Sequence, residues 1–148
     1  MFDETILIID DEAMILNVAT DMLKTLGYRI LTANNGPAAI ELYRQQMNRI
    51  DLIILDMIMP DMSGSEVFDE LKRINPRIKI LLSSGYSLNS QAAQILDRGC
   101  DGFIQKPFTL RDISRQMREI LGNKTKASPQ LPLRSEERRV GKECRSRW

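Results

Sequence analysis

The chain has 148 residues, 43% hydrophobic and 28% charged, a composition typical of one globular domain that can bury a core without disulfides or metals. No apolar run approaches the roughly 18 residues that cross a bilayer and no signal-peptide pattern is present, so we expect a soluble, cytoplasmic protein. The chain contains no histidine, which excludes a Ser/His/Asp triad, a histidine-based zinc site and phosphohistidine chemistry within it.

The net charge of +1 is unevenly distributed. Residues 1–123 carry 13 basic and 17 acidic side chains, whereas residues 124–148 carry 8 and 3. Residues 123–148 have two prolines and no hydrophobic period, which predicts a disordered basic tail. Its end, RSEERRVGKECRSRW, resembles translated vector sequence, so we expect a domain over 1–122 followed by a non-native tail. Cys100 and Cys144 lack metal-ligand spacing, which favours a packed thiol at Cys100.

The first apolar run, Ile6 to Ile9, predicts a buried strand that ends at the acidic residues Asp10, Asp11 and Glu12. A helical period follows from Ala13 and stops at Gly27. Its predicted buried stripe comprises Ile15, Val18, Ala19, Met22 and Leu26. Residues 28–33 predict a second strand. A second helix starts near Pro37, and its apolar residues are Ala39, Ile40, Leu42, Tyr43 and Met47.

The third run, Leu52 to Leu55, is apolar at every position, as in strands buried on both faces of a parallel sheet. It stops at Asp56, and Pro60 prevents the strand from continuing. In open α/β sheets ligands bind outside the carboxyl ends of the strands, so Asp56 is a site candidate. The alternative is an aspartate that only caps the next helix. That helix has an apolar face of Val67, Phe68, Leu71 and Ile74 and ends before Pro76.

The last two βα units follow the same plan. Ile78 to Leu82 predict a fourth strand that ends in Ser83, Ser84 and Gly85. A weaker helix over Asn89–Asp97 stops at Gly99, and Gly102–Gln105 form a short strand that ends at Lys106. Thr109 and Asp112 have the spacing of a capping box at the start of the last helix, whose predicted buried stripe is Leu110, Ile113, Met117, Ile120 and Leu121.

Five βα units with right-handed crossovers predict an α/β fold, a parallel sheet with helices on both faces. The strand ends then bring Asp10, Asp11, Asp56, Ser84 and Lys106 to one edge. Three clustered carboxylates repel one another, and a hard divalent cation, Mg²⁺ or Mn²⁺, is the simplest compensation. With Lys106 and Ser84 as donors to phosphoryl oxygens, this set predicts phosphoryl transfer to Asp56.

Four motifs carry a resemblance to a known family: LIIDDE at 7–12, LDMIMPDMSG at 55–64, LLSSGYS at 81–87 and FIQKPF at 103–108. In this order they strongly resemble the receiver domain of two-component response regulators, over about residues 4–122. The resemblance implies a flavodoxin-like, three-layer fold with a five-stranded parallel sheet of order 2-1-3-4-5.

The resemblance also implies residue roles. Asp56 would be the phosphoacceptor, and Mg²⁺ would be held by Asp11, Asp56 and the Ile58 backbone carbonyl, with Asp10 acting mainly through a metal-bound water. Ser84, which precedes a small residue, matches the switch hydroxyl better than Ser83, and Phe103 matches the switch aromatic without the hydroxyl of the commoner tyrosine. The bond between Lys106 and Pro107 is expected to be cis.

The partner expected from the resemblance is a histidine kinase or a histidine phosphotransfer domain. Phosphorylation would switch the face formed by the Asn89–Asp97 helix, the fifth strand and the Thr109–Leu121 helix, through which a receiver dimer could also form. We expect a signalling phosphoacceptor with no separate turnover substrate, hence no enzyme in the usual sense, and no membrane contact.

The 26 residues after Gly122 cannot hold a helix-turn-helix module, so no direct nucleic-acid binding is expected. The motifs look most like C-terminal receivers of hybrid histidine kinases, and a stand-alone regulator is the alternative.

Three alternative functions can be compared with the sequence. A dehalogenase-like phosphatase places a second aspartate two residues after its nucleophile, where this chain has Ile58. A dinucleotide-binding domain needs a GxGxxG turn after its first strand, where this chain has DDEAMI. A non-phosphorylated pseudo-receiver that only binds other proteins would be expected to lack an acid or the lysine, and it stays the alternative although none is missing.

Overall fold

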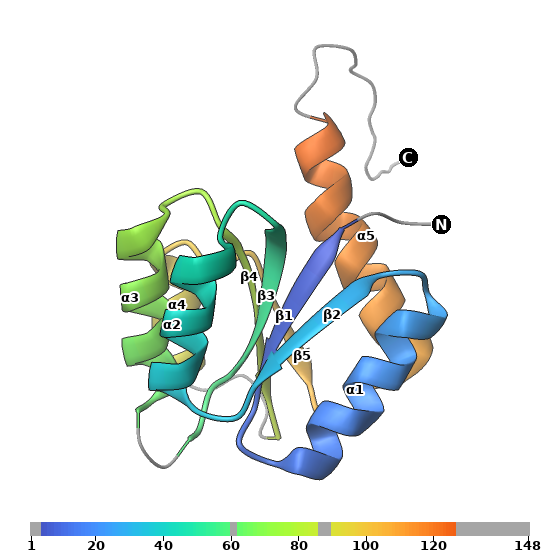
Figure 1. Cartoon of the computed structure of the whole chain (residues 1–148), viewed down its shortest axis with the longest axis horizontal. Coiled ribbons are helices and arrows are strands. Elements are labelled where there is room, and N and C mark those ends of the chain that lie inside the picture. Colours follow the sequence, from blue (N-terminus) through green and yellow to red (C-terminus); the bar gives the residue numbers. More distant parts are fainter. Residues whose placement is uncertain (1–3, 60–61, 86–89, 127–148) are drawn as a thin grey trace.

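Five strands alternate with five helices in the computed structural model, which describes residues 4–59, 62–85 and 90–126 (Figure 1). The strands are β1 (Thr5–Ile9), β2 (Arg29–Ala33), β3 (Ile50–Asp56), β4 (Lys79–Ser84) and β5 (Gly102–Gln105). The helices are α1 (Ala13–Thr25), α2 (Gly36–Gln46), α3 (Gly64–Ile74), α4 (Ser90–Asp97) and α5 (Leu110–Lys126). No described helix has both the length and the apolar character that a membrane span requires.

The strands form one parallel sheet in the order β2-β1-β3-β4-β5. This is the flavodoxin-like order predicted from the sequence, which is therefore confirmed. The order reverses between β1 and β3, where a crevice opens outside the carboxyl ends of the strands. The residues that follow β1, β3, β4 and β5 therefore meet at one edge of the sheet.

Alternate residues of the central strands point into two separate cores. On β1, Ile6 and Ile8 pack in the core beneath α1 and α5, whereas Leu7 and Ile9 pack in the core beneath α2, α3 and α4. Figure 1 shows these two helix layers on opposite faces of the sheet. Because both faces are covered, the central strands are apolar at nearly every position, which explains the unbroken runs in the sequence.

Local signals place the element ends where the sequence predicts them. Gly27 and Gly99 adopt positive φ angles of 100° and 109° after α1 and α4. Asn35 caps α2 by accepting a hydrogen bond from the Ala38 amide at 2.8 Å. Thr109 and Asp112 make the reciprocal bonds of a capping box at the start of α5. The Lys106–Pro107 bond is cis, as expected.

Parts of two predicted helix stripes are wrong. Val18 is 46% exposed and Leu110 is 41% exposed, whereas Leu16 and Leu23 are buried on α1. Helix α1 carries apolar residues on two faces, since Met14 is also exposed, so periodicity alone did not show which face meets the sheet.

The described chain extends beyond the predicted domain end. Helix α5 continues to Lys126, four residues beyond position 122. The rest of the predicted tail, with Cys144, lies outside the described residues, as do Pro60, Asp61 and the predicted helix start Asn89. Cys100 is half-buried, and its thiol donates to the Ile80 carbonyl at 3.2 Å, which fits the packed role predicted for it.

Candidate functional site

Asp56 is the last residue of β3 and only 4% exposed. On one side, the Met57 amide donates to the Ser83 carbonyl of β4 at 2.9 Å. On the other, the Gly64 amide donates to the Met57 carbonyl at 2.9 Å, so the loop after Asp56 returns to its starting point. A side chain at Gly64 would place its Cβ 2.7 Å from Met57 Cα, so this close return depends on glycine.

Asp10 and Asp11 follow β1 and differ in burial. Asp10 is 2% exposed, and its Oδ1 accepts a hydrogen bond from the Glu12 amide at 2.9 Å. Asp11 is exposed and lines the pocket. Carboxylate oxygens of Asp10, Asp11 and Asp56 lie within 4.8 Å of one another. The three acids that sequence reasoning placed at one edge are thus brought together.

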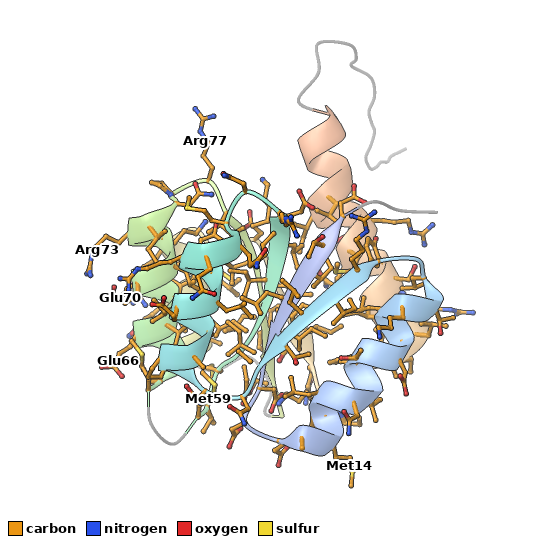
Figure 2. The ribbon with its side chains drawn as sticks, in the orientation of Figure 1. Met14, Met59, Glu66, Glu70, Arg73 and Arg77 are labelled. Carbon is orange, nitrogen blue, oxygen red and sulfur yellow. The ribbon has the colours of Figure 1, made fainter. Side chains whose placement is uncertain are left out.

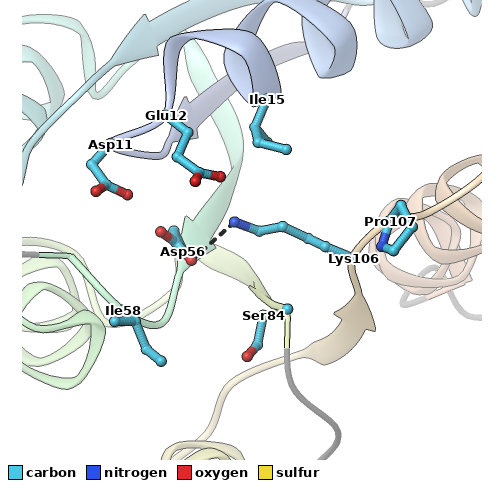
Figure 3. A pocket seen from close by; sticks show the side chains of 9 residues that line it. Asp11, Glu12, Ile15, Asp56, Ile58, Ser84, Lys106 and Pro107 are labelled. Atoms are coloured by element: carbon cyan, nitrogen blue, oxygen red, sulfur yellow. Dashed lines mark hydrogen bonds and ion pairs between the residues drawn. The ribbon is translucent and has the colours of Figure 1, made fainter.

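Lys106 places its ammonium between two of these acids. Its Nζ lies 2.6 Å from Asp10 Oδ2 and 3.2 Å from Asp56 Oδ1, the second contact being drawn in Figure 3. Burial alone would lower the pKa of Lys106, but its contacts with Asp10 and Asp56 outweigh burial and raise that pKa. The lysine therefore stays charged and offsets part of the acidic cluster.

The surroundings of Asp56 make its ionised form unfavourable. Burial, and then the nearby charge of Asp10, raise the pKa of Asp56 from 3.8 to about 6. Lys106 and the Ile58 backbone amide act in the opposite direction without cancelling this rise. Asp56 is therefore ionised at neutral pH, and additional positive charge nearby would stabilise this ionised form.

Asp11, Asp56 and Lys106 line a pocket of about 580 Å³ at the carboxyl edge of the sheet, shown in Figure 3. Ser84 and Ile58 line it, as predicted, whereas Ser83 is buried and pairs with Asp56 in the sheet register. Four lining residues were not predicted as site residues: Gly85 and Pro107, which adjoin predicted ones, and Glu12 and Ile15. The only sequence signal for Glu12 and Ile15 was their proximity to Asp11, just before α1.

Phe103, the predicted switch aromatic, lies on β5 and does not line this pocket. Its ring is half-buried against the core beneath α2, α3 and α4. Its carbonyl accepts a hydrogen bond from Gln116 Nε2 of α5 at 3.2 Å. The ring thus packs beneath α2, α3 and α4, whereas the backbone of the same residue is bonded to α5.

The donor set fits a hard divalent cation. All three side chains offer oxygens within 4.8 Å of one another, and carboxylate oxygens are the ligands that Mg²⁺ prefers. Asp10 already uses one oxygen for the Glu12 amide and the other for Lys106. Asp11, being exposed to the pocket, is the freer ligand, which agrees with an indirect contribution from Asp10.

A sequence model of the response regulator receiver domain matches residues 6–118. The probable transcriptional regulatory protein TcrX of Mycobacterium tuberculosis is 32% identical over 79% of this chain and 49% of its own length. The sensor kinase CckA of Brucella abortus is 29% identical over 79% of this chain and 12% of its own. The chain thus spans about half the length of the first relative and about an eighth of the second.

Solved structures show the same architecture. A response regulator receiver domain protein from Clostridium thermocellum superposes with a TM-score of 0.79, at 29% identity, over 84% of this chain and 98% of its own. A CheY-like receiver domain protein from Methanospirillum hungatei has a TM-score of 0.75 at 27% identity, over 84% and 98%. With its family model, strand order and acidic edge in agreement, the chain belongs to the response regulator receiver domain family.

Proposed function

We propose that this receiver is a cytoplasmic phosphoacceptor that takes a phosphoryl group from a phosphohistidine of a histidine kinase or phosphotransfer domain onto Asp56, with Mg²⁺. The observation that carries the proposal is the position of Lys106, whose ammonium reaches both Asp10 and Asp56 from a different strand end. A purely structural aspartate would not need this arrangement at the mouth of an open pocket.

In the proposed reaction an Asp56 oxygen attacks the phosphorus of the donor. A P–O bond forms, the P–N bond breaks, and the imidazole keeps the electron pair and takes a proton from water. Asp56 must be ionised to attack, and its pKa of about 6 makes it so at neutral pH. Lys106 Nζ, 3.2 Å from Asp56 Oδ1, is within reach of the new phosphoryl oxygens.

Asp11, Asp56 and the Ile58 carbonyl would hold Mg²⁺, with Asp10 acting through water, and Mn²⁺ would fit the same oxygens. When bound, the metal would neutralise charge on the phosphoryl oxygens. The residues of the chain do the rest: Asp10 keeps Lys106 in place, and Ser84 presents a hydroxyl at the pocket wall.

The readout that we propose runs through Ser84 and Phe103. A phosphoryl group of about −2 charge would draw the Ser84 hydroxyl toward it, and Phe103 would turn into the space behind it. This would change the face of α4, β5 and α5, which we propose as the surface for partner binding or receiver dimerisation. We further propose that the domain acts as a signalling switch without a separate turnover substrate.

The experiment is incubation of the purified chain with a small phosphodonor, followed by intact mass spectrometry. Wild type should gain one phosphoryl group only with Mg²⁺ present, and Asp56→Asn should gain none. The pseudo-receiver alternative predicts no gain in either protein. Equal gains in both would show that Asp56 is not the acceptor. Labelled ATP alone should leave the chain unlabelled, because it holds no histidine.

A further inference from the structure

We propose that Arg98 is a positioning residue that pins the carboxyl end of α4 to α3, so that α4 moves about this end when Asp56 is phosphorylated. The inference rests on the proposed function and adds to it a fixed point for α4, the helix whose movement would signal phosphorylation. It follows from contacts that lie away from the Ser84 and Phe103 switch.

Arg98, the residue after α4, contacts three residues of α3. Its Nε lies 3.2 Å from Asp69 Oδ1, and a terminal nitrogen donates to Ser65 Oγ at 2.6 Å. Its guanidinium carbon lies 5.7 Å from the centroid of the Phe68 ring. A planar guanidinium can use several N–H groups and its face at once, which a lysine ammonium cannot do.

The chain that follows Arg98 is also fixed. Gly99 turns the backbone with a φ of 109°. The Asp101 amide donates to the Ile80 carbonyl and its carboxylate accepts from the Ile80 amide, both at 2.9 Å. The carboxyl end of α4 is therefore attached to α3 by Arg98 and to β4 by Asp101.

The two ends of α4 are connected to the phosphorylation site through different elements, β4 at the amino end and α3 at the carboxyl end. Its amino end follows β4, whose last residue, Ser84, lines the pocket. Its carboxyl end is attached to the first turn of α3 at Ser65, and α3 starts at Gly64, which is bonded to Met57 beside Asp56. A displacement of Ser84 would thus reach α4 at its amino end while Arg98 holds the other end.

The contact is moderate in strength. The side chains of Arg98 and Asp69 are 38% and 52% exposed, and an exposed ion pair alone would stabilise little. Here the ion pair acts together with the Ser65 hydrogen bond and the Phe68 ring contact, so removing the guanidinium removes three contacts. Losing these three contacts is enough to change the equilibrium constant between two positions of α4 about two- to thirtyfold.

The test compares wild type, Arg98→Ala and Ser65→Ala by amide NMR, with residual dipolar couplings, before and after beryllofluoride and Mg²⁺ are added. Arg73→Ala is the matched control, because Arg73 is an exposed arginine of α3 that pairs with Glu70 of the same helix and points away from the protein (Figure 2). Arg98→Lys keeps the charge and should give an intermediate response.

In wild type and in Arg73→Ala, beryllofluoride should shift the amides of Ser90 to Ala93 more than those of Asp97 to Cys100. The ratio of the first set of shift changes to the second should fall by about twofold or more in Arg98→Ala and in Ser65→Ala. The angle between α3 and α4 should change as well. If both variants bind beryllofluoride and keep the wild-type ratio and angle, Arg98 has no such role. If wild type itself shows no saturable response, the proposed function fails, and this inference with it.

Discussion

Replacing Asp56 by asparagine should stabilise the metal-free protein at neutral pH. The pKa of Asp56 is raised from 3.8 to about 6 by burial and by the charge of Asp10. A folded-state pKa above the unfolded value means that ionisation of Asp56 destabilises the fold. This penalty is absent below about pH 4, grows between about pH 4 and pH 6, and is complete above that range.

The size of the effect follows from the shift, which corresponds to about 3 kcal/mol at full ionisation. Asparagine has nearly the same shape and no charge, and Lys106 keeps its 2.6 Å contact with Asp10 in the variant. The unfolding free energy of Asp56→Asn should therefore exceed that of wild type by up to about 3 kcal/mol near pH 8, and the difference should vanish near pH 4.

The assay is urea unfolding followed by circular dichroism in EDTA, at intervals between about pH 4 and pH 8. Asp21→Asn, at an exposed acid of α1, is the control and should differ from wild type by no more than about 0.5 kcal/mol throughout. A pH-independent difference for Asp56→Asn, or a variant less stable than wild type near pH 8, would refute the reasoning about this carboxylate.

Three further substitutions test other parts of the account. Lys106→Met leaves the buried carboxylates of Asp10 and Asp56 without their ammonium and should lower the unfolding free energy by about 3 to 5 kcal/mol in metal-free buffer, with partial recovery on adding Mg²⁺. Gly64→Ala should cost about 1 to 3 kcal/mol and weaken Mn²⁺ binding measured by electron paramagnetic resonance, because its Cβ would meet the backbone beside Asp56. Tyr43→Phe removes the acceptor of a 2.9 Å hydrogen bond from Asn75 and should cost about 1 kcal/mol by urea unfolding while leaving phosphoryl uptake unchanged.

The fold could be predicted because its strongest determinants are local. Unbroken apolar runs mark strands covered on both faces. Glycines at positions 27 and 99 mark helix ends, because glycine tolerates the positive φ angles that the backbone adopts there. The exposed face of α1 could not be predicted in the same way. Met14 and Val18 are apolar but exposed, and only the position of α1 against the sheet selects Leu16 and Leu23 for burial.

The membership of the site could be predicted from the edge rule for parallel sheets, but its internal contacts could not. The rule places Asp10, Asp56 and Lys106 at one edge, without showing that the ammonium lies between the two carboxylates. Arg98 had no local signal, because its partners on α3 lie about 30 residues earlier in the chain and are set by tertiary packing.

Chemical mapping of the phosphorylated residue tests the central claim most directly. Borohydride reduces an aspartyl phosphate to homoserine, which peptide mass spectrometry can locate after a phosphohistidine donor domain and Mg²⁺ have been added. We expect homoserine at position 56, and none when Mg²⁺ is replaced by EDTA. Homoserine at position 10 or 11 instead, or a phosphoryl group on a serine, would contradict the assignment of Asp56 as the phosphoacceptor.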